Sequence, residues 1–202
     1  MPDDRIPPRP AEEWDEQHKP VAEGLFAFCT KTHGATTKWH DDRNSLIGPF
    51  PAFIASRELS IPLADFMTKL GQWKACPIEA KETVVLVAAA RYQAAYLLYA
   101  HTEITLAKTK MTKDQIDSIK SGKKPTGLSE AADVAYDASY HLINTPGPLP
   151  IEIWNKCDKV LGRDGTVAMM NWLGWYTFNC IFVNAIDAGV PESEQKGDES
   201  KS

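Results

Sequence analysis

The sequence has only four cysteines, and their positions exclude the usual cysteine-based sites. They stand far apart along the chain, at Cys29, Cys76, Cys157 and Cys180. Zinc sites and Cys-x-x-Cys redox motifs need closely spaced cysteines. We therefore expect four reduced, mostly buried thiols, and we predict no metal site and no cofactor.

The sequence also has no segment suited to a membrane. A spanning helix needs about 20 consecutive apolar residues, and polar residues interrupt every long apolar run here. Residues 1–8 contain no apolar stretch of the kind found in signal peptides. These features predict a cytoplasmic protein with no membrane partner.

An excess of positive charge is missing as well. The 22 Lys and Arg residues are outnumbered by 27 Asp and Glu residues, giving a net charge of −5. This balance argues against a nucleic-acid-binding surface. It leaves open a small acidic substrate, because a local site can be basic on an acidic protein.

No segment shows the sustained alternation of apolar and polar residues that is typical of exposed strands. We therefore predict an all-α fold with one domain over residues 11–191. Residues 1–10, with four prolines, and residues 192–202, with no apolar side chain, are predicted to be disordered tails. The expected helices cover residues 11–32, 52–57, a segment capped by Ser60, a segment opened by Pro77, a short helix from the capping box at Thr112 and Gln115, residues 129–143, a helix begun by Pro150, and residues 164–188.

Three ordered stretches carry a family resemblance. Gly48-Pro49-Phe50 is followed by a helix near Ser60, a long helical segment runs from Lys81 to His101, and Gly174 to Glu192 ends the pattern. In this order they resemble the carboxymuconolactone decarboxylase family over residues 46–192. The resemblance implies an all-α, alkyl hydroperoxidase D-like fold and subunits that assemble into trimers or hexamers. The family contains cofactor-free lactone decarboxylases, hydroperoxidases and members linked to secondary metabolism.

The sequence departs from both branches of that family. In the peroxidase branch a Cys-x-x-Cys pair precedes a histidine, and a glutamate lies upstream. By this resemblance the histidine matches His101, the glutamate matches Glu82, and the cysteine positions hold Ala94 and Leu97. Thiol–disulfide exchange needs a thiolate, so family-type peroxidase chemistry is not expected. The decarboxylase branch usually has an acidic residue where Leu97 stands.

His101 and Glu82 are the predicted catalytic residues. Decarboxylation or double-bond isomerisation needs stabilisation of an enolate-like charge and a proton transfer at carbon. An imidazole suits the proton step because its ordinary pKa is about 6.5. A carboxylate can orient the ring or act as a base itself.

The distance along the chain limits this assignment. Glu82 and His101 are 19 residues apart, which is about 28 Å on one straight helix. They can share a site only if the helix breaks between them. The resemblance implies such a break near Tyr92–Ala95, where the sequence has no glycine or proline.

Four further residues are predicted substrate contacts. Tyr96 and Tyr99 are expected beside any pocket near His101, with hydroxyls that need partners. Trp175 is assigned to the substrate wall, although a place in the core or a subunit interface is the competing interpretation. Arg43 lies in a polar and aromatic loop and could bind a substrate carboxylate.

These observations support three hypotheses. The leading one is a cofactor-independent decarboxylase or isomerase-type lyase acting on a small organic acid, lactone or polyketide-like ring, in a homo-oligomer. The second is a non-catalytic ligand-binding or assembly protein on the same scaffold. The third is residual hydroperoxidase activity through Cys76 or Cys157.

Overall fold

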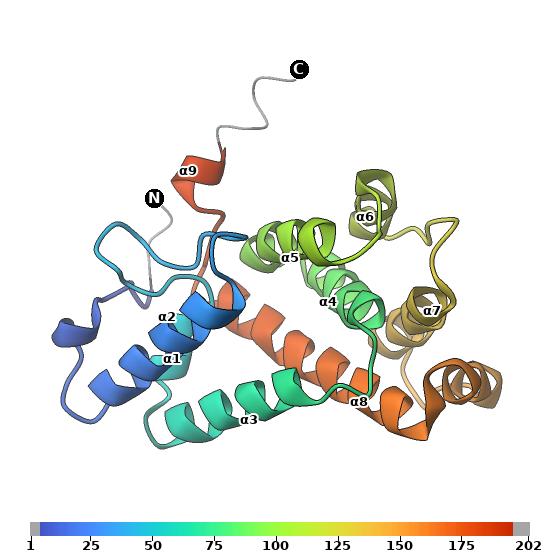
Figure 1. Ribbon diagram of the computed structural model, residues 1–202, viewed down its shortest axis with the longest axis horizontal. Coiled ribbons are helices and arrows are strands. Elements are labelled where there is room, and N and C mark those ends of the chain that lie inside the picture. The colour runs from blue at the N-terminus through green and yellow to red at the C-terminus, as the bar shows by residue number, and fades with distance from the viewer. Residues whose placement is uncertain (1–4, 196–202) are drawn as a thin grey trace.

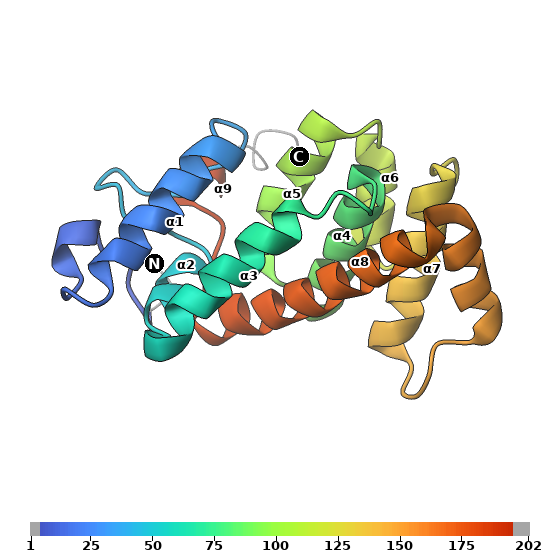
Figure 2. The same cartoon turned by 60° about the horizontal axis from the view of Figure 1, so that its bottom comes forward.

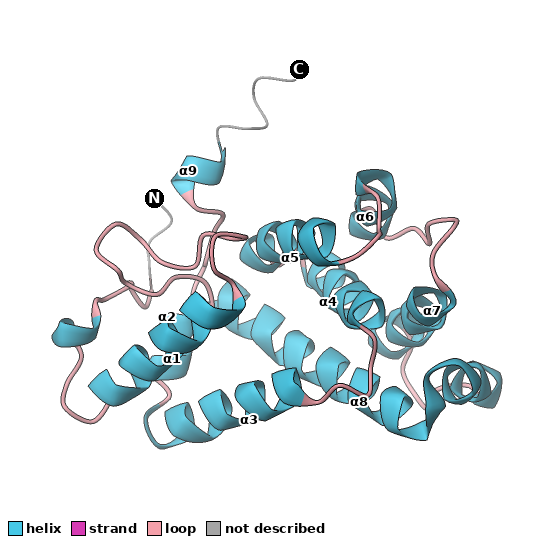
Figure 3. Cartoon of the chain, in the orientation of Figure 1, coloured by secondary structure: helices cyan, strands magenta, loops and turns pink. Residues whose placement is uncertain are grey.

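The computed structural model describes residues 5–195 of the chain, and these residues fold as helices and connecting loops (Figure 3). The one β-type contact within them is an isolated antiparallel bridge between His40 and Leu46. The predicted all-α architecture is confirmed for this part of the chain. None of the helices described in residues 5–195 combines the length and apolarity of a membrane span.

The helices follow one another along the chain with short connections. Their bounds are η1 Ala11–Glu13, α1 Lys19–Thr32, α2 Phe50–Ile54, η2 Arg57–Leu59, α3 Ser60–Gln72, α4 Ile78–Tyr92, α5 Ala95–Lys108, α6 Lys113–Lys120, α7 Glu130–Asn144, α8 Ile151–Ala185 and α9 Glu192–Gln195.

Helix α4 forms the centre of the main core. Every residue from Ala80 to Ala90 on it is buried, so the helix is surrounded by protein on all sides. α5, α7 and α8 pack around it, as Figure 1 shows. Val84 and Val85 contact this core from α4, and Met169 and Val183 contact it from α8. Two adjacent polar residues, Lys81 and Glu82, are buried with the apolar ones, and such groups need partners.

A second core joins the N-terminal helices to the second half of α8. Leu25 of α1, Phe53 of α2, Leu70 of α3 and Trp175 of α8 lie in it. Helix α8 therefore connects the two cores, and it runs along one side of the molecule beneath α3 and α4 (Figure 2).

Most of the predicted boundaries are confirmed by the structure. Thr112 and Gln115 form the reciprocal capping box that starts α6. Pro77 and Pro150 directly precede α4 and α8. The last two predicted helices are separated at Gly162, whose backbone is non-helical with φ 70°.

Three predicted boundaries are wrong. The helix expected over residues 11–32 is interrupted between η1 and α1, where the Asp15 carboxylate accepts hydrogen bonds from the backbone N–H groups of Gln17 and His18. Such a side-chain turn competes with helical hydrogen bonding. Ser60 does not cap α3, because its hydroxyl donates to the Arg57 carbonyl oxygen. The helix expected at residues 52–57 lies at Phe50–Ile54 instead.

The ends of the chain are described only in part. The predicted tail over residues 1–10 includes Arg5, which donates to the Ala185 carbonyl oxygen, and Arg9, whose guanidinium lies over the Trp14 ring. The predicted tail over residues 192–202 begins with the short helix α9. Residues 1–4 and 196–202 lie outside the described part.

Gly48 brings the loop before α2 against α5. Its φ is 71°, and a Cβ placed there would lie 2.2 Å from a ring carbon of Tyr96. A side chain is therefore excluded by backbone conformation and by space.

We expect the Gly48→Ala variant to lose more stability than the Gly34→Ala variant. Both glycines have positive φ, so both changes carry a backbone cost of about 1 kcal/mol. Only Gly48→Ala forces Tyr96 to move, which adds about 1–3 kcal/mol of overpacking. Urea unfolding of both variants measures the difference. Equal losses would contradict the close approach of this loop to α5.

Candidate functional site

The chain reverses between α4 and α5 without glycine or proline. α4 ends at Tyr92 and α5 begins at Ala95, and the predicted break is confirmed. Gln93 provides the turn by adopting a left-handed conformation with φ 52°. The Ala94 N–H then closes it by donating to the Ala89 carbonyl oxygen over 3.0 Å. The two helices therefore lie against each other instead of forming one rod.

This reversal places the predicted catalytic residues in direct contact. His101 Nδ1 lies 2.7 Å from Glu82 Oε2, and the two residues are 5% and 4% exposed. Thr105 lies one turn beyond His101, and its hydroxyl is 2.5 Å from the His101 carbonyl oxygen and 3.5 Å from Glu82 Oε2. In the contact between His101 and Glu82 the carboxylate accepts the hydrogen bond, so we assign the proton to Nδ1 of the imidazole.

His101 and Glu82 each have a second polar side-chain atom that is not used in this contact. Neither His101 Nε2 nor Glu82 Oε1 hydrogen-bonds to any residue in the described part of the chain. Other polar atoms of that part lack a partner and are fully enclosed by protein, but these two atoms are not among them. Each atom therefore keeps a small solvent-accessible area. In the tautomer that has its proton on Nδ1, Nε2 carries the lone pair.

Aromatic side chains of α8 form one wall beside the pair. The Tyr176 ring meets the His101 ring edge to face, with centroids 4.8 Å apart. Trp172 stacks on Tyr176 at 5.4 Å and 10°. Burial, reinforced by the nearby Glu82, raises the pKa of Tyr176 well above its ordinary value, so its phenol stays protonated at neutral pH. The Tyr176 side chain as a whole is partly buried.

His33, which directly follows α1, is a neighbour of His101 that the sequence analysis did not single out. Burial, together with the nearby His101 and Lys108, lowers its pKa to about 4. Its Nδ1 is enclosed and has no hydrogen-bond partner. The ring is therefore neutral at pH 7 and lies close enough to His101 to interact electrostatically. Nothing in the local sequence distinguished it from an ordinary loop histidine.

Tyr96 and Tyr99 secure the long loop against α5. The Tyr96 hydroxyl donates to the Lys38 carbonyl oxygen at 3.1 Å, and the Lys38 N–H donates to the Tyr99 hydroxyl at 3.0 Å. Both hydroxyls are therefore used by the same loop residue. The two tyrosines lie on the same helix as His101, and their observed contacts are structural.

Arg43 and Trp175 lie apart from the His101–Glu82 pair. Arg43 is exposed, forms an ion pair with Glu13, and borders a hollow of about 720 Å³ between the long loop and residues 186–193. Trp175 is buried in the second core, where it stacks with Phe53 and Phe178. The structure joins neither residue to His101 or Glu82 by a hydrogen bond, ion pair or ring contact.

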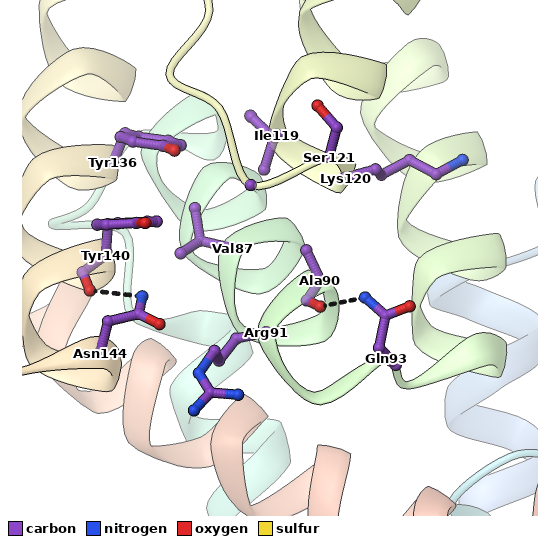
Figure 4. A pocket seen from close by; sticks show the side chains of 11 residues that line it. Val87, Ala90, Arg91, Gln93, Ile119, Lys120, Ser121, Tyr136, Tyr140 and Asn144 are labelled. Carbon is purple, nitrogen blue, oxygen red and sulfur yellow. Dashed lines mark hydrogen bonds between the residues drawn. The ribbon is translucent and has the colours of Figure 1, made fainter.

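A separate crevice lies between α4, α6 and α7 (Figure 4). Its volume is about 420 Å³, and Arg91, Lys120 and the stacked rings of Tyr136 and Tyr140 border it. None of its lining residues belongs to the His101–Glu82 pair or to the aromatic wall.

The four thiols are enclosed by the protein. All four cysteines are free and buried, which confirms the predicted environment. Burial raises the pKa of both Cys76 and Cys157 to about 11. The family cysteine positions, Ala94 and Leu97, lie at the start of α5 with 0% and 3% exposure. Within residues 5–195, no group of three or more His, Cys, Asp or Glu side chains is placed to hold a metal ion.

The neutral His33 predicts a specific acid sensitivity of the fold. Its pKa of about 4 lies below the ordinary 6.5, so the unfolded chain binds a proton between these pH values that the folded chain does not. The free energy of unfolding therefore has its full value above pH 6.5 and falls as the pH drops toward 4. We expect His33→Gln to remove on the order of 2 kcal/mol of this loss, since one pKa unit corresponds to about 1.4 kcal/mol.

Chemical denaturation at pH 7 and at pH 4.5 measures this effect. His141→Gln, which replaces a histidine of α7 outside the site, is the matched control and should keep the wild-type pH dependence. An unchanged pH dependence in His33→Gln would show that the ring is not held neutral.

The sequence matches no protein-family model and no curated protein. Two solved structures are similar to it over nearly the whole chain. One is a cysteine-to-alanine variant of the debrominase Bmp8 in complex with 2,3,4-tribromopyrrole, with 12% identity, a TM-score of 0.67, and coverage of 97% of this chain and 96% of that chain. The other is apo Bmp8, with 12% identity, a TM-score of 0.69, and coverage of 95% of each chain. At this identity the likeness concerns the fold, which is all-α and alkyl hydroperoxidase D-like.

Proposed function

We propose that this protein is a cofactor-independent lyase that uses His101 and Glu82 to move a proton on a small organic acid, lactone or polyketide-like ring. The observation that carries the proposal is the buried 2.7 Å contact between the two side chains, with the second nitrogen of the imidazole left without a partner. The reaction is either loss of carbon dioxide or isomerisation of a neighbouring double bond.

The geometry supports a division of roles within the pair. His101 Nε2 would take a proton from carbon or deliver one to it. Glu82 would hold the ring through Nδ1 and stabilise the imidazolium that forms, as the carboxylate does in other carboxylate–histidine pairs. The low exposure of both groups strengthens this electrostatic effect, because little water competes with it.

The similar structures support the size and shape of the proposed substrate. The ligand bound to the Bmp8 variant, 2,3,4-tribromopyrrole, is a small planar ring. Here the wall beside His101 is formed by the stacked rings of Trp172 and Tyr176, which suits a planar substrate. The debrominase activity belongs to Bmp8, and we do not transfer it to a chain with alanine and leucine at the cysteine positions of the family pattern.

Variants of the pair test the proposed roles. The assay follows a panel of small β-keto acids and unsaturated lactones in D₂O by NMR, which detects both deuterium uptake at carbon and loss of the carboxyl group. We expect His101→Ala to lower kcat by about 10²–10⁴-fold, the usual contribution of a general acid or base. Glu82→Gln should lower kcat less, because it keeps a partner for the ring while removing the charge.

Thr102→Ala is the matched control, since Thr102 follows His101 and its hydroxyl donates to the Leu98 carbonyl oxygen outside the pair. It should retain wild-type turnover. Unchanged turnover in both His101→Ala and Glu82→Gln, on a substrate that the wild type converts, would refute the assigned roles.

Hydroperoxidase activity through the remaining thiols is a competing hypothesis with a direct test. Cys76 and Cys157 are buried with raised pKa values, so few thiolates exist at neutral pH. We expect a Cys76→Ser, Cys157→Ser double variant to keep full activity on any converted substrate, measured with and without iodoacetamide. Loss of activity after thiol modification would favour the hydroperoxidase interpretation.

A non-catalytic ligand-binding or assembly protein remains the alternative from another class. It predicts tight binding of a small ring without turnover of any member of the panel. The homo-oligomer also remains a prediction. It is supported by exposed apolar residues on α8, where Val167 and Ile181 are 39% and 52% exposed and Gly174 lies midway between them.

A further inference from the structure

Lys81 is a buried cation beside the proposed site. It lies in the first part of α4, directly before Glu82, and is 5% exposed. Its ammonium donates one hydrogen bond, over 2.9 Å, to the Trp73 carbonyl oxygen. The same ammonium lies over the ring of Trp172, 5.0 Å from its centroid. A neutral carbonyl and an aromatic ring are therefore its partners.

An anionic partner for Lys81 is missing within residues 5–195. No carboxylate there lies within ion-pair distance of its ammonium. Glu82 follows it in sequence, but the Glu82 carboxylate is hydrogen-bonded to His101. A lysine is almost never fully buried without a charged partner, because desolvating an ammonium is costly. Burial accordingly lowers the pKa of Lys81, and an anion bound beside the ammonium would oppose that shift.

Trp172 adds a second unsatisfied donor at the same place. Its indole Nε1 is enclosed and has no hydrogen-bond partner. An indole N–H can only donate, and leaving a buried donor unpaired costs about 1–3 kcal/mol. The ring that carries this N–H is also the ring that Lys81 covers and that stacks on Tyr176. An ammonium without an anionic partner and an indole N–H without an acceptor thus lie together, next to the Tyr176 ring that contacts His101.

From these observations we propose that Lys81 and Trp172 bind a carboxylate of the substrate, through the ammonium and the indole N–H. The ligand class is a small planar ring that bears a carboxylate. This inference rests on the proposed function for the statement that the ligand is a substrate. The carboxylate-binding site itself is argued from the Lys81 ammonium, which lacks an anionic partner, and from the Trp172 N–H, which lacks an acceptor.

The geometry assigns this carboxylate an anchoring role. A cation next to a carboxylate stabilises its charge, which opposes loss of carbon dioxide from that same group. The reacting carbon would instead lie toward His101, past the stacked rings of Trp172 and Tyr176. Lys81 and Trp172 are then binding residues, and their removal should raise KM far more than it lowers kcat.

Binding of matched ligands tests the site without requiring turnover. Isothermal titration calorimetry compares pyrrole-2-carboxylate with pyrrole-2-carboxamide, which keeps the ring and removes the charge. We expect the wild type to prefer the carboxylate at least tenfold. Lys81→Met, which keeps the length of the side chain, should abolish that preference. Trp172→Phe should weaken carboxylate binding several-fold while keeping a ring to stack on Tyr176.

One variant is the matched control for this experiment. Arg91→Ala removes an exposed cation of the same helix α4, at the separate crevice, and should leave the preference unchanged. Thermal unfolding confirms that each variant is folded at the temperature of titration.

The outcomes separate this inference from the proposed function. Equal affinity of the wild type for both ligands, no measurable binding of either, or an unchanged preference in folded Lys81→Met would each refute the carboxylate-binding site. A preference that depends on Lys81, together with turnover that is insensitive to His101→Ala, would support the site and refute the proposed chemistry.

Discussion

The hydrogen bond between Glu82 and His101 is the interaction on which the arrangement of the site depends. Glu82 lies on a helix whose residues from Ala80 to Ala90 are all buried, so its carboxylate has little access to bulk water. Leaving such a charge without a partner costs several kcal/mol. The imidazole of α5 satisfies it, which requires α5 to pack along α4. The same contact therefore holds two helices together and orients the ring, and stability and catalysis would share one interaction.

Helix α8 extends the site away from this pair. Its residues Trp172 and Tyr176 are four positions apart, so their side chains lie on one face of the helix and stack at 5.4 Å. Tyr176 contacts His101, and Trp172 contacts the Lys81 ammonium. A single helical face thus connects the two neighbouring polar residues of α4, Lys81 and Glu82, although their side chains have different partners.

The sequence was informative where local rules decide structure and uninformative where tertiary contacts do. Capping at Thr112 and the helix starts after Pro77 and Pro150 follow from local chemistry, and they were predicted. The turn at Gln93 was not readable from the residues, because a left-handed glutamine is unusual and is held by packing of both helices. The sequence resemblance alone indicated it. Ser60 had the right residue type for a cap, but its hydroxyl bonds backward to Arg57.

The site residues show the same division. Glu82 and His101 could be paired from family spacing, whereas His33 and Trp172 come from distant parts of the chain and carry no motif. Arg43 had suitable chemistry and is instead paired with Glu13. The tertiary structure shows which polar groups have a hydrogen-bond or ion-pair partner and which do not. The sequence alone does not show this. Within the described part of this chain, His101 and Trp172 each contact the Tyr176 ring and each keep a ring nitrogen without a hydrogen-bond partner, and the Lys81 ammonium lies over Trp172 without an anionic partner. It is this cluster of polar groups without matching partners, more than any single motif, that supports the proposed ligand site.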